Sequence, residues 1–186
     1  GPHCTQILGD LGADIIKVER VENGDDTRKF APPFMKDENG NDTDQSAYFS
    51  GTNRNKRSIT LNLNSPEGQD IAKQLIAKSD ILVENFKVGT LEKYGLDYDT
   101  LKNEFPSLIY CSITGFGQTG PYSKRPAYDA LVQAMGGVMS LTGDAKGEPM
   151  KVGVSIADLM AGMYGTVSIL AALRHRDKTN EGQHLD

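Results

Sequence analysis

Residues 57–84 have the sequence RSITLNLNSPEGQDIAKQLIAKSDILVE, which predicts a strand, a helix and a second strand. Residues 57–63 alternate polar and apolar side chains, as a strand with one buried face does. Ser65, Pro66 and Glu67 then form a helix start, with a capping hydroxyl, a proline in the first turn and an acid near the positive end of the helix dipole. Residues 80–84 form a second apolar run that is rich in residues typical of strands. A strand–helix–strand unit of this kind predicts parallel strands.

The same alternation extends along the rest of the chain. Further strands are expected at residues 14–19 and 107–113. Helices are expected at residues 5–12, 128–139 and 156–174, and one or two short helices between 91 and 105. Strands this apolar indicate a sheet with helices on both faces, so we predict an α/β, Rossmann-like fold with a mostly parallel sheet. Residues 20–46 are rich in Asp, Asn, Gly and Pro and are expected to form one long loop.

Composition limits the class of protein. The chain has 186 residues, 20 basic and 25 acidic, with a formal net charge of −5, and a single domain over residues 1–186 is expected. The acidic balance disfavours nucleic acid as a partner, because phosphate binding needs a basic face. The two cysteines, Cys4 and Cys111, lie far apart. This excludes a cysteine-rich zinc site or disulfide scaffold and favours a reducing cytoplasm.

The two ends of the sequence indicate a piece of a longer protein. Residues 182–186 resemble the start of a strand that is then cut off. The helix expected at residues 5–12 has no strand before it, although α/β folds alternate the two. No secretory signal is visible at the start of the chain.

Several polar residues follow expected strands, where ligands of parallel sheets bind. Arg20 follows the strand at 14–19, and its guanidinium could hold a ribose phosphate. Asn85 and Phe86 follow the strand at 80–84 and could hydrogen-bond and stack on a flat ligand. A turn residue and a core ring are the simpler interpretation of this pair.

Two other patterns could bind phosphates. Arg54, Lys56 and Arg57 cluster before a strand, and either a phosphate site or a solvated strand start explains them. Residues 115–120, GFGQTG, match the dinucleotide motif GxGxxG. Pro121 follows at once and the next helix is expected too late to meet a pyrophosphate, so a glycine-rich connection is favoured over an NAD site.

Asp158 is the one ionisable residue in the apolar run 152–173. The run is long enough for a transmembrane helix. However, glycine, serine and threonine interrupt it, which favours a buried helix of a soluble domain. Ser155 and Asp158 have the spacing of a capping box. Alternatively, a carboxylate kept ionised at a helix N-terminus could act as a covalent nucleophile. Spacing alone favours the cap.

Other catalytic motifs do not occur. The sequence contains no HExxH, GxSxG or Walker loop, and its three histidines are scattered without a second ligand at metal spacing. A zinc site, a serine triad and a P-loop are therefore disfavoured.

Six segments together are more specific than any one of them. They are GDLGADIIKVER (9–20), GDDTR (24–28), NRNKRS (53–58), VENF (83–86), SITGFGQTGP (112–121) and YD (128–129). In this order they resemble the family III CoA-transferases over nearly the whole chain. The resemblance implies a CoA-binding, Rossmann-like large domain that is incomplete here, with a first strand, a small domain and a C-terminal return outside the chain. It also implies an interlocked homodimer, and the 186-residue piece alone is expected to be inactive.

The resemblance also assigns roles to individual residues. Asp158 would attack an acyl-CoA thioester, forming first an acyl-aspartyl anhydride and then an aspartyl-CoA thioester that passes CoA to an acceptor acid. The positions that would contact CoA are Arg20 (ribose phosphate), Leu61 (adenine region), Asn85 and Phe86 (pantetheine or nucleotide), Lys93 and Tyr128. Coenzyme A is the carrier, and no metal, NAD or membrane is implied. Residues 24–28 and 110–121 are most similar to members that use succinyl-CoA and dicarboxylic acids.

Two alternatives remain open. α-Methylacyl-CoA racemases share the fold but need a base on each face of the α-carbon, one of them a histidine. That histidine would fall at Tyr128, and a phenol, with a usual pKa of about 10, is a poor base for this proton. The transferase is therefore favoured over the racemase. The third hypothesis is a non-catalytic nucleotide-binding module.

Overall fold

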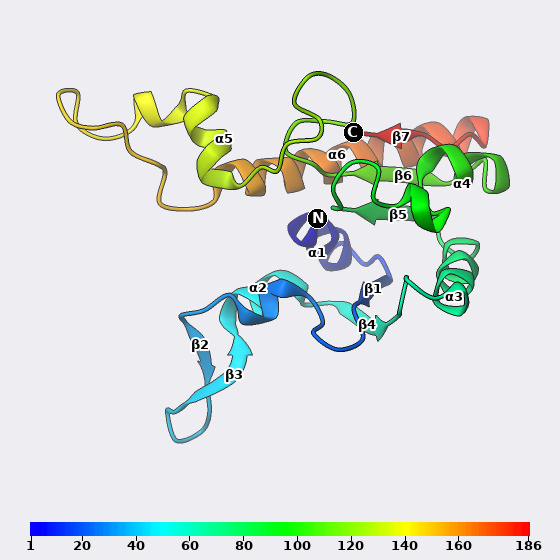
Figure 1. Ribbon diagram of the computed structural model, residues 1–186, viewed down its shortest axis with the longest axis horizontal. Helices are drawn as coiled ribbons and strands as arrows, with labels where there is room; N and C mark the ends of the chain where they lie inside the picture. Colours follow the sequence, from blue (N-terminus) through cyan, green and yellow to red (C-terminus); the bar gives the residue numbers. More distant parts are fainter. The chain divides into compact units, whose positions relative to one another are not determined.

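The computed structural model describes residues 1–186, which form two compact units. One unit is Pro2–Lys78, and the other is Ser79–Asp186 together with Gly1. Each unit has its own parallel sheet (Figure 1). The α/β fold class is thus confirmed, with two parallel sheets. The single domain expected over residues 1–186 stays a prediction.

The unit Pro2–Lys78 is built on a two-stranded parallel sheet. Strands β1 (Ile15–Glu19) and β4 (Lys56–Thr60) pair in register from Ile15 opposite Lys56 to Glu19 opposite Thr60. Helix α1 (Pro2–Asp10) contacts β1 and helix α2 (Ala47–Asn53). Helix α3 (Pro66–Ile76) follows β4, and Ser65 caps it as predicted, because its hydroxyl accepts a hydrogen bond from the Gly68 N–H at 3.2 Å.

The expectation of one long loop over residues 20–46 was wrong. This segment contains the 3-10 helix η1 (Asp26–Lys29) and an antiparallel ribbon of β2 (Phe34–Lys36) and β3 (Asp42–Ser46). The ribbon escaped the sequence analysis because β3 has the polar sequence DTDQS, which lacks the apolar alternation of a strand. Gly40 turns the chain between the two strands with a φ of 81°.

The unit around Ser79–Asp186 has a three-stranded parallel sheet in the order β5-β6-β7. Strand β5 is Ile81–Glu84, β6 is Ile109–Ser112 and β7 is His184–Leu185. The central strand β6 is buried throughout, as expected for a strand covered on both faces. The elements η2 (Glu92–Tyr94) and α4 (Tyr98–Glu104) lie between β5 and β6. The strand expected near residue 184 is confirmed.

Two helices follow β6 and carry the candidate nucleophile. The single helix expected over 128–139 is instead α5 (Asp129–Met135) and a 3-10 turn, η3 (Val138–Leu141). The break falls at Gly137, whose φ of 81° no helix accommodates. Helix α6 (Ile156–Thr179) contacts β6 and β7, and its Ile169 is fully buried.

Helix α6 is less buried than predicted. It is the one helix that is long and apolar enough to cross a membrane by length and composition, and 22% of its most apolar window is buried. The expectation of a buried helix was therefore wrong for this chain, where Met163, Tyr164 and Val167 are exposed. The apolar run reflects a helix that covers the sheet with one face and leaves the other face unpacked.

Gly68 allows the turn before α3 to approach the helix closely. A Cβ at this position would lie 2.0 Å from the Asn62 carbonyl oxygen, whereas a Cβ at Gly51 in α2 would meet nothing within 4 Å. We expect G68A to destabilise the full-length protein by about 1–3 kcal/mol through this overlap. We expect G51A, the matched control, to stabilise it by about 0.5–1 kcal/mol through helix propensity. Thermal unfolding measures both, and an unchanged melting midpoint for G68A would contradict the packing described here.

Candidate active site

The first turn of α6 presents Asp158 without using it as a cap. Ser155 occupies the N-cap position, but its side chain makes no cap hydrogen bond. The Asp129 carboxylate from α5 takes this place, because its Oδ1 accepts from the Ala157 N–H at 2.9 Å and the Asp158 N–H at 3.5 Å. The capping box predicted from Ser155 and Asp158 is therefore wrong, and the Asp158 carboxylate is left for other chemistry.

The environment of Asp158 favours the protonated form more than water does. Partial burial of the carboxyl group raises its pKa, the negative charge of Asp129 raises it further, and the Gly1 amino group acts in the opposite direction. The residue as a whole is exposed, so solvent still reaches it. A carboxylate with raised basicity that a substrate can reach has the properties of a nucleophile or base.

A cavity of about 320 Å³ lies along the same face of α6. Its walls are the end of β6, the loop that follows, residues 161, 164, 165 and 168 of α6, and residues 185 and 186. Asp158 lies three residues before Ala161, so both project from one side of the helix. The cavity also opens at the carboxyl ends of parallel strands, where ligands bind in such sheets. These features make the start of α6 the candidate active site.

Asn85 and Phe86 follow β5 at the same edge of the sheet. The Asn85 side-chain amide donates to the Ile113 carbonyl oxygen and so ties the end of β5 to the end of β6. The Phe86 ring is 45% exposed, so the interpretation of Phe86 as a core ring was wrong. The ring is available to a ligand, as its predicted role requires.

Lys93 and Tyr128 lie in the same unit as Asp158. The Lys93 Nζ lies 4.5 Å from the centre of the Tyr94 ring. Tyr128 precedes α5 and is 80% exposed. Their assignment to CoA stays a prediction.

Arg20 and Leu61 belong to the unit Pro2–Lys78. Arg20 follows β1, and its guanidinium binds the Gly24 carbonyl oxygen at 3.2 Å and pairs with Asp26. The side chain is 62% exposed, so a phosphate can reach it. Leu61 is 8% exposed, and its backbone N–H donates to the Glu19 carbonyl oxygen at 3.0 Å. The proposed contacts of both residues with CoA stay predictions.

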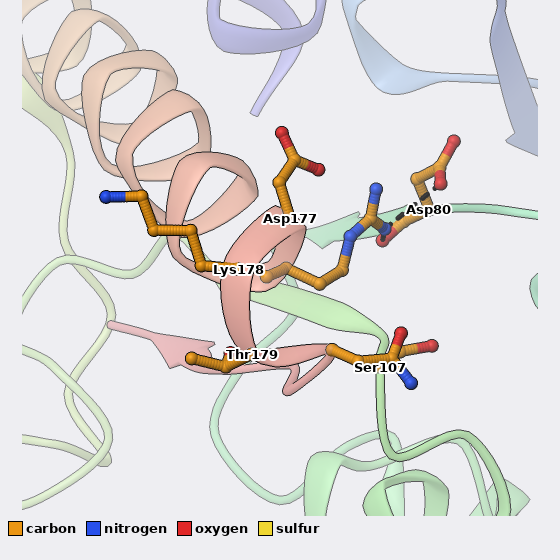
Figure 2. A pocket seen from close by; sticks show the side chains of 7 residues that line it. Asp80, Ser107, Asp177, Lys178 and Thr179 are labelled. Carbon is orange, nitrogen blue, oxygen red and sulfur yellow. Dashed lines mark hydrogen bonds and ion pairs between the residues drawn. The ribbon is translucent and has the colours of Figure 1, made fainter.

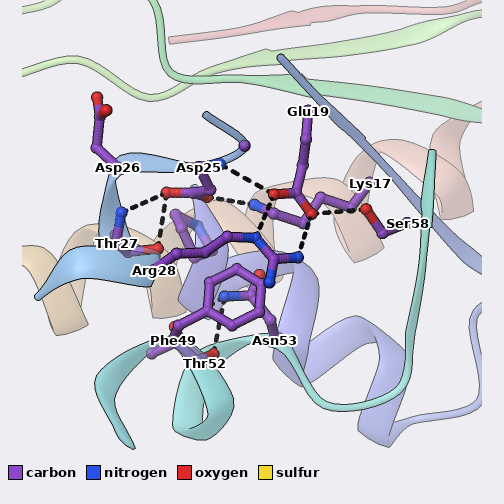
Figure 3. A network of polar contacts seen from close by, with 12 residues as sticks. Lys17, Glu19, Asp25, Asp26, Thr27, Arg28, Phe49, Thr52, Asn53 and Ser58 are labelled. Atoms are coloured by element: carbon purple, nitrogen blue, oxygen red, sulfur yellow. Dashed lines mark hydrogen bonds and ion pairs between the residues drawn. The ribbon is translucent and has the colours of Figure 1, made fainter. Parts of the chain in front are cut away.

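A network of ionic contacts holds the segment that follows Arg20 (Figure 3). The Glu19 carboxylate, 2% exposed, accepts two hydrogen bonds from Arg28, at 2.7 and 2.9 Å, and one from Ser58 at 2.6 Å. The pKa of Glu19 is lowered to about 2, chiefly by the hydrogen bonds from Arg28, although burial acts to raise it. The Arg28 guanidinium in turn stacks on Phe49 at 3.9 Å.

A second ion pair completes this network. Lys17 pairs with Asp25, and the Asp25 carboxylate also accepts from Thr27. Burial acts to raise the pKa of Asp25, but the bonds from Lys17 and Thr27 prevail and lower it to about 2. The sequence analysis missed both ion pairs, although the segment 24–28 was among the motifs. Only the fold shows that Arg28 returns to the end of β1.

The basic cluster before β4 is engaged by the protein itself. Arg54 pairs with Asp10 and Arg57 with Asp14, each at 2.5 Å. Lys56 donates to the Pro2 and Thr52 carbonyl oxygens at 2.8 and 2.9 Å, and burial lowers its pKa to about 8. Of the two interpretations of this cluster, the structure favours a structural role over a phosphate site.

Other candidate sites find less support. The segment 115–120 is followed by no helix until α5 begins at Asp129, as the interpretation against NAD requires. No group of three or more His, Cys, Asp and Glu side chains could hold a metal ion. Neither cysteine forms a disulfide.

A larger polar cavity, of about 510 Å³, lies at the other end of α6 (Figure 2). Its walls include Asp80, Ser107 and Arg176, and Arg176 pairs with Asp80 at 3.0 Å. Asp80 precedes β5, so this cavity lies at the amino ends of the strands. None of the predicted site residues lines it, and parallel sheets bind ligands at the opposite edge.

Comparison with known proteins gives a consistent result. Residues 1–186 match the sequence profile of CoA-transferase family III. The chain is 51% identical to succinate–glutarate CoA-transferase of Agrobacterium fabrum, of which it covers 46%. It is 46% identical to succinyl-CoA:glutarate CoA-transferase of Mus musculus, of which it covers 41%. Both matches extend over the whole of this chain.

A solved structure shows the same fold. The crystal structure of a CAIB/BAIF family protein from Brucella suis superposes with a TM-score of 0.92 and 51% sequence identity. The match covers all of this chain and 48% of the other. The chain thus spans about half the length of the relatives it matches.

The Glu19–Arg28 pair predicts an acid dependence of stability. The pKa of Glu19 is lowered in the folded state, so its stabilising effect is complete above about pH 5 and is lost as the pH falls toward about 2. Glu19→Gln removes the charge and should destabilise the full-length protein by about 3 kcal/mol at neutral pH. Urea unfolding at several pH values measures this effect.

The variant should also lose part of the parental dependence on acid. Glu22→Gln, at an exposed position just after the network, is the matched control and should behave as the parent does. A Glu19→Gln protein with parental stability at neutral pH, or with the full parental loss in acid, would show that the pair contributes little.

Proposed function

The chain belongs to family III of the CoA-transferases, and we propose that the whole protein transfers CoA from an acyl-CoA donor to a carboxylic acid through Asp158. The observation that carries the proposal is the Asp158 carboxylate, which lies in the first turn of α6 while Asp129 caps the helix in its place. Its pKa is raised, and the cavity begins one turn further along the same helix face. These are the properties that a carboxylate nucleophile needs.

The proposed reaction consumes one thioester and forms another, with a mixed anhydride between them. An Asp158 oxygen attacks the thioester carbonyl of the donor, and the carbon–sulfur bond breaks. CoA leaves as a thiolate, and a mixed anhydride of the donor acid and Asp158 remains. The thiolate then attacks the Asp158 carbonyl carbon, releasing the donor acid and leaving an aspartyl-CoA thioester. The acceptor carboxylate repeats these two steps in reverse and departs as the new acyl-CoA, which restores the Asp158 carboxylate.

Such an exchange depends on positioning more than on driving force. A thioester and a carboxylate are consumed and formed in equal numbers, so the protein mainly has to align the reactants and stabilise the oxyanion of each tetrahedral intermediate. No metal or redox carrier is required by this chemistry.

We propose CoA contacts in each unit separately. In Pro2–Lys78, Arg20 would hold the ribose phosphate, with Leu61 near the adenine. In the unit around Ser79–Asp186, the proposed contacts are Asn85, Phe86, Lys93 and Tyr128. The exposure of Arg20, Phe86 and Tyr128 supports these assignments. Arg20 is paired with Asp26 in the absence of ligand, so a phosphate would have to replace that carboxylate.

Succinyl-CoA and a dicarboxylic acid are the proposed substrates. Succinate and glutarate appear in the names of the relatives from Agrobacterium fabrum and Mus musculus, which are 51% and 46% identical to this chain. We further propose that the full-length protein is a cytoplasmic, interlocked homodimer and that the 186-residue piece alone does not turn over. Light scattering of the full-length protein tests the dimer.

The racemase remains the second candidate. Its support is limited to the shared fold, because the position of its histidine is Tyr128 and the named relatives are transferases. Incorporation of solvent deuterium at the α-carbon of an acyl-CoA, without exchange of CoA between acids, would favour the racemase. A non-catalytic module would show neither reaction in the full-length protein.

Asp158→Asn tests the proposed function. The amide cannot attack a thioester as a carboxylate does, so transfer of CoA from succinyl-CoA to glutarate should fall by at least about 10³-fold. Chromatography of the acyl-CoA products in full-length protein measures the loss. Asp177→Asn, near the other end of the same helix, is the matched control and should retain parental activity. Undiminished transfer by Asp158→Asn would exclude Asp158 as the nucleophile.

Arg20→Gln tests the proposed phosphate contact. Loss of a charge-assisted hydrogen bond to the 3′-phosphate should raise the KM for succinyl-CoA by about 10-fold or more. The KM for the dephospho analogue, which lacks that phosphate, should change little. Arg57→Gln alters a similarly exposed arginine of β4 and should leave both values unchanged. Equal effects of Arg20→Gln on the two substrates would place the 3′-phosphate elsewhere.

A further inference from the structure

The start of α6 is held by a chain of hydrogen bonds that does not include Asp158. Asp129 Oδ1 accepts from the backbone N–H groups of Ala157 and Asp158, at 2.9 and 3.5 Å. The first N–H groups of a helix have no acceptor within the helix, and a side chain of the helix usually supplies one. Here the acceptor comes from α5, 28 residues earlier in the sequence.

A buried glutamine fixes this acceptor. Gln133, which is 1% exposed, lies one turn after Asp129 on α5 and donates to Asp129 Oδ2 at 2.6 Å. Its other amide atom, Oε1, accepts from the Val152 N–H at 2.8 Å, and Nε2 also lies 3.4 Å from the Val154 carbonyl oxygen. Gln133 therefore joins Asp129 to the segment that leads into α6.

From this arrangement we propose that Asp129, anchored by Gln133, is a positioning residue that keeps the Asp158 carboxylate free and oriented for attack. The inference rests on the proposed transferase function and adds a role that the assignment of Asp158 alone does not contain. Without Asp129, the N–H groups of Ala157 and Asp158 would lose this acceptor, and the turn that carries Asp158 would lose the contact that holds it to α5. A carboxylate on a loosened turn would reach the thioester carbon in the productive orientation less often.

The charge of Asp129 adds a second effect. All the hydrogen-bond partners of its carboxylate are N–H groups rather than cationic side chains, and its negative charge acts on Asp158. Acylation turns the Asp158 carboxylate into a neutral anhydride or thioester, which relieves the repulsion between the two carboxylates. Asp129 therefore favours the covalent intermediates over the free carboxylate.

Asp129→Asn in the full-length protein tests the proposal, because it retains an oxygen for the helix and removes the charge. We expect kcat for transfer from succinyl-CoA to fall on the order of 10²-fold with little change in KM. The acid limb of the pH–rate profile, which reports ionisation of Asp158, should move to lower pH because the repulsion is gone. A purely structural role would lower the melting midpoint without moving that limb. Asp144→Asn, in an exposed loop of the same unit, is the control.

The outcomes separate the two proposals. If Asp129→Asn is folded and keeps the parental kcat and acid limb, the positioning role is overturned, while loss of transfer in Asp158→Asn would still support the transferase. If Asp158→Asn retains transfer, the proposed function itself fails. Should Asp129→Asn not fold, Asp129→Glu decides, because it keeps the charge but displaces it by one methylene. A kcat within about twofold of the parent would then overturn the proposal, and a fall on the order of 10-fold or more would support it.

Discussion

The free N–H groups at the start of α6 require an acceptor, and the rest of the site depends on which carboxylate supplies it. Asp129 does so from α5, at 2.9 Å from the Ala157 nitrogen. The helix start is thus held from α5, and the Ser155 side chain makes no cap hydrogen bond of the kind that the capping box predicts. Asp158 remains in the first turn of the helix, where the dipole favours an anion, and on the face that continues into the cavity.

The two units use the same chemical group in opposite ways. Glu19 is surrounded by donors, chiefly Arg28, and its pKa falls to about 2. Asp158 is partly buried with Asp129 as a neighbour, and its pKa rises. An acid that stays ionised is suited to hold the segment after Arg20 in place, whereas an acid whose charge is disfavoured gains most from acylation. The environment, and not the residue type, separates the structural from the reactive carboxylate.

Local patterns in the sequence predicted the elements but not the contacts between them. The α3 start at Ser65, the strands β5 and β6 and the late start of α5 follow from caps and apolar periodicity, and the structure confirms them. The polar ribbon at 34–46 has no such pattern. The Asp129 cap and the Arg28 partner of Glu19 join residues that are 28 and 9 positions apart. Such pairs depend on how the chain folds back, which spacing alone does not specify.

In the proposed mechanism, Asp158 carries first the acyl group and then CoA. The most direct measurement incubates the full-length protein with succinyl-CoA, adds hydroxylamine, and examines the peptides by mass spectrometry. Hydroxylamine converts an activated acyl carbon into a hydroxamate, so we expect an aspartyl hydroxamate at Asp158 that forms only when acyl-CoA is present. CoA transfer that proceeds at its normal rate, with Asp158 unmodified under trapping conditions, would contradict this mechanism.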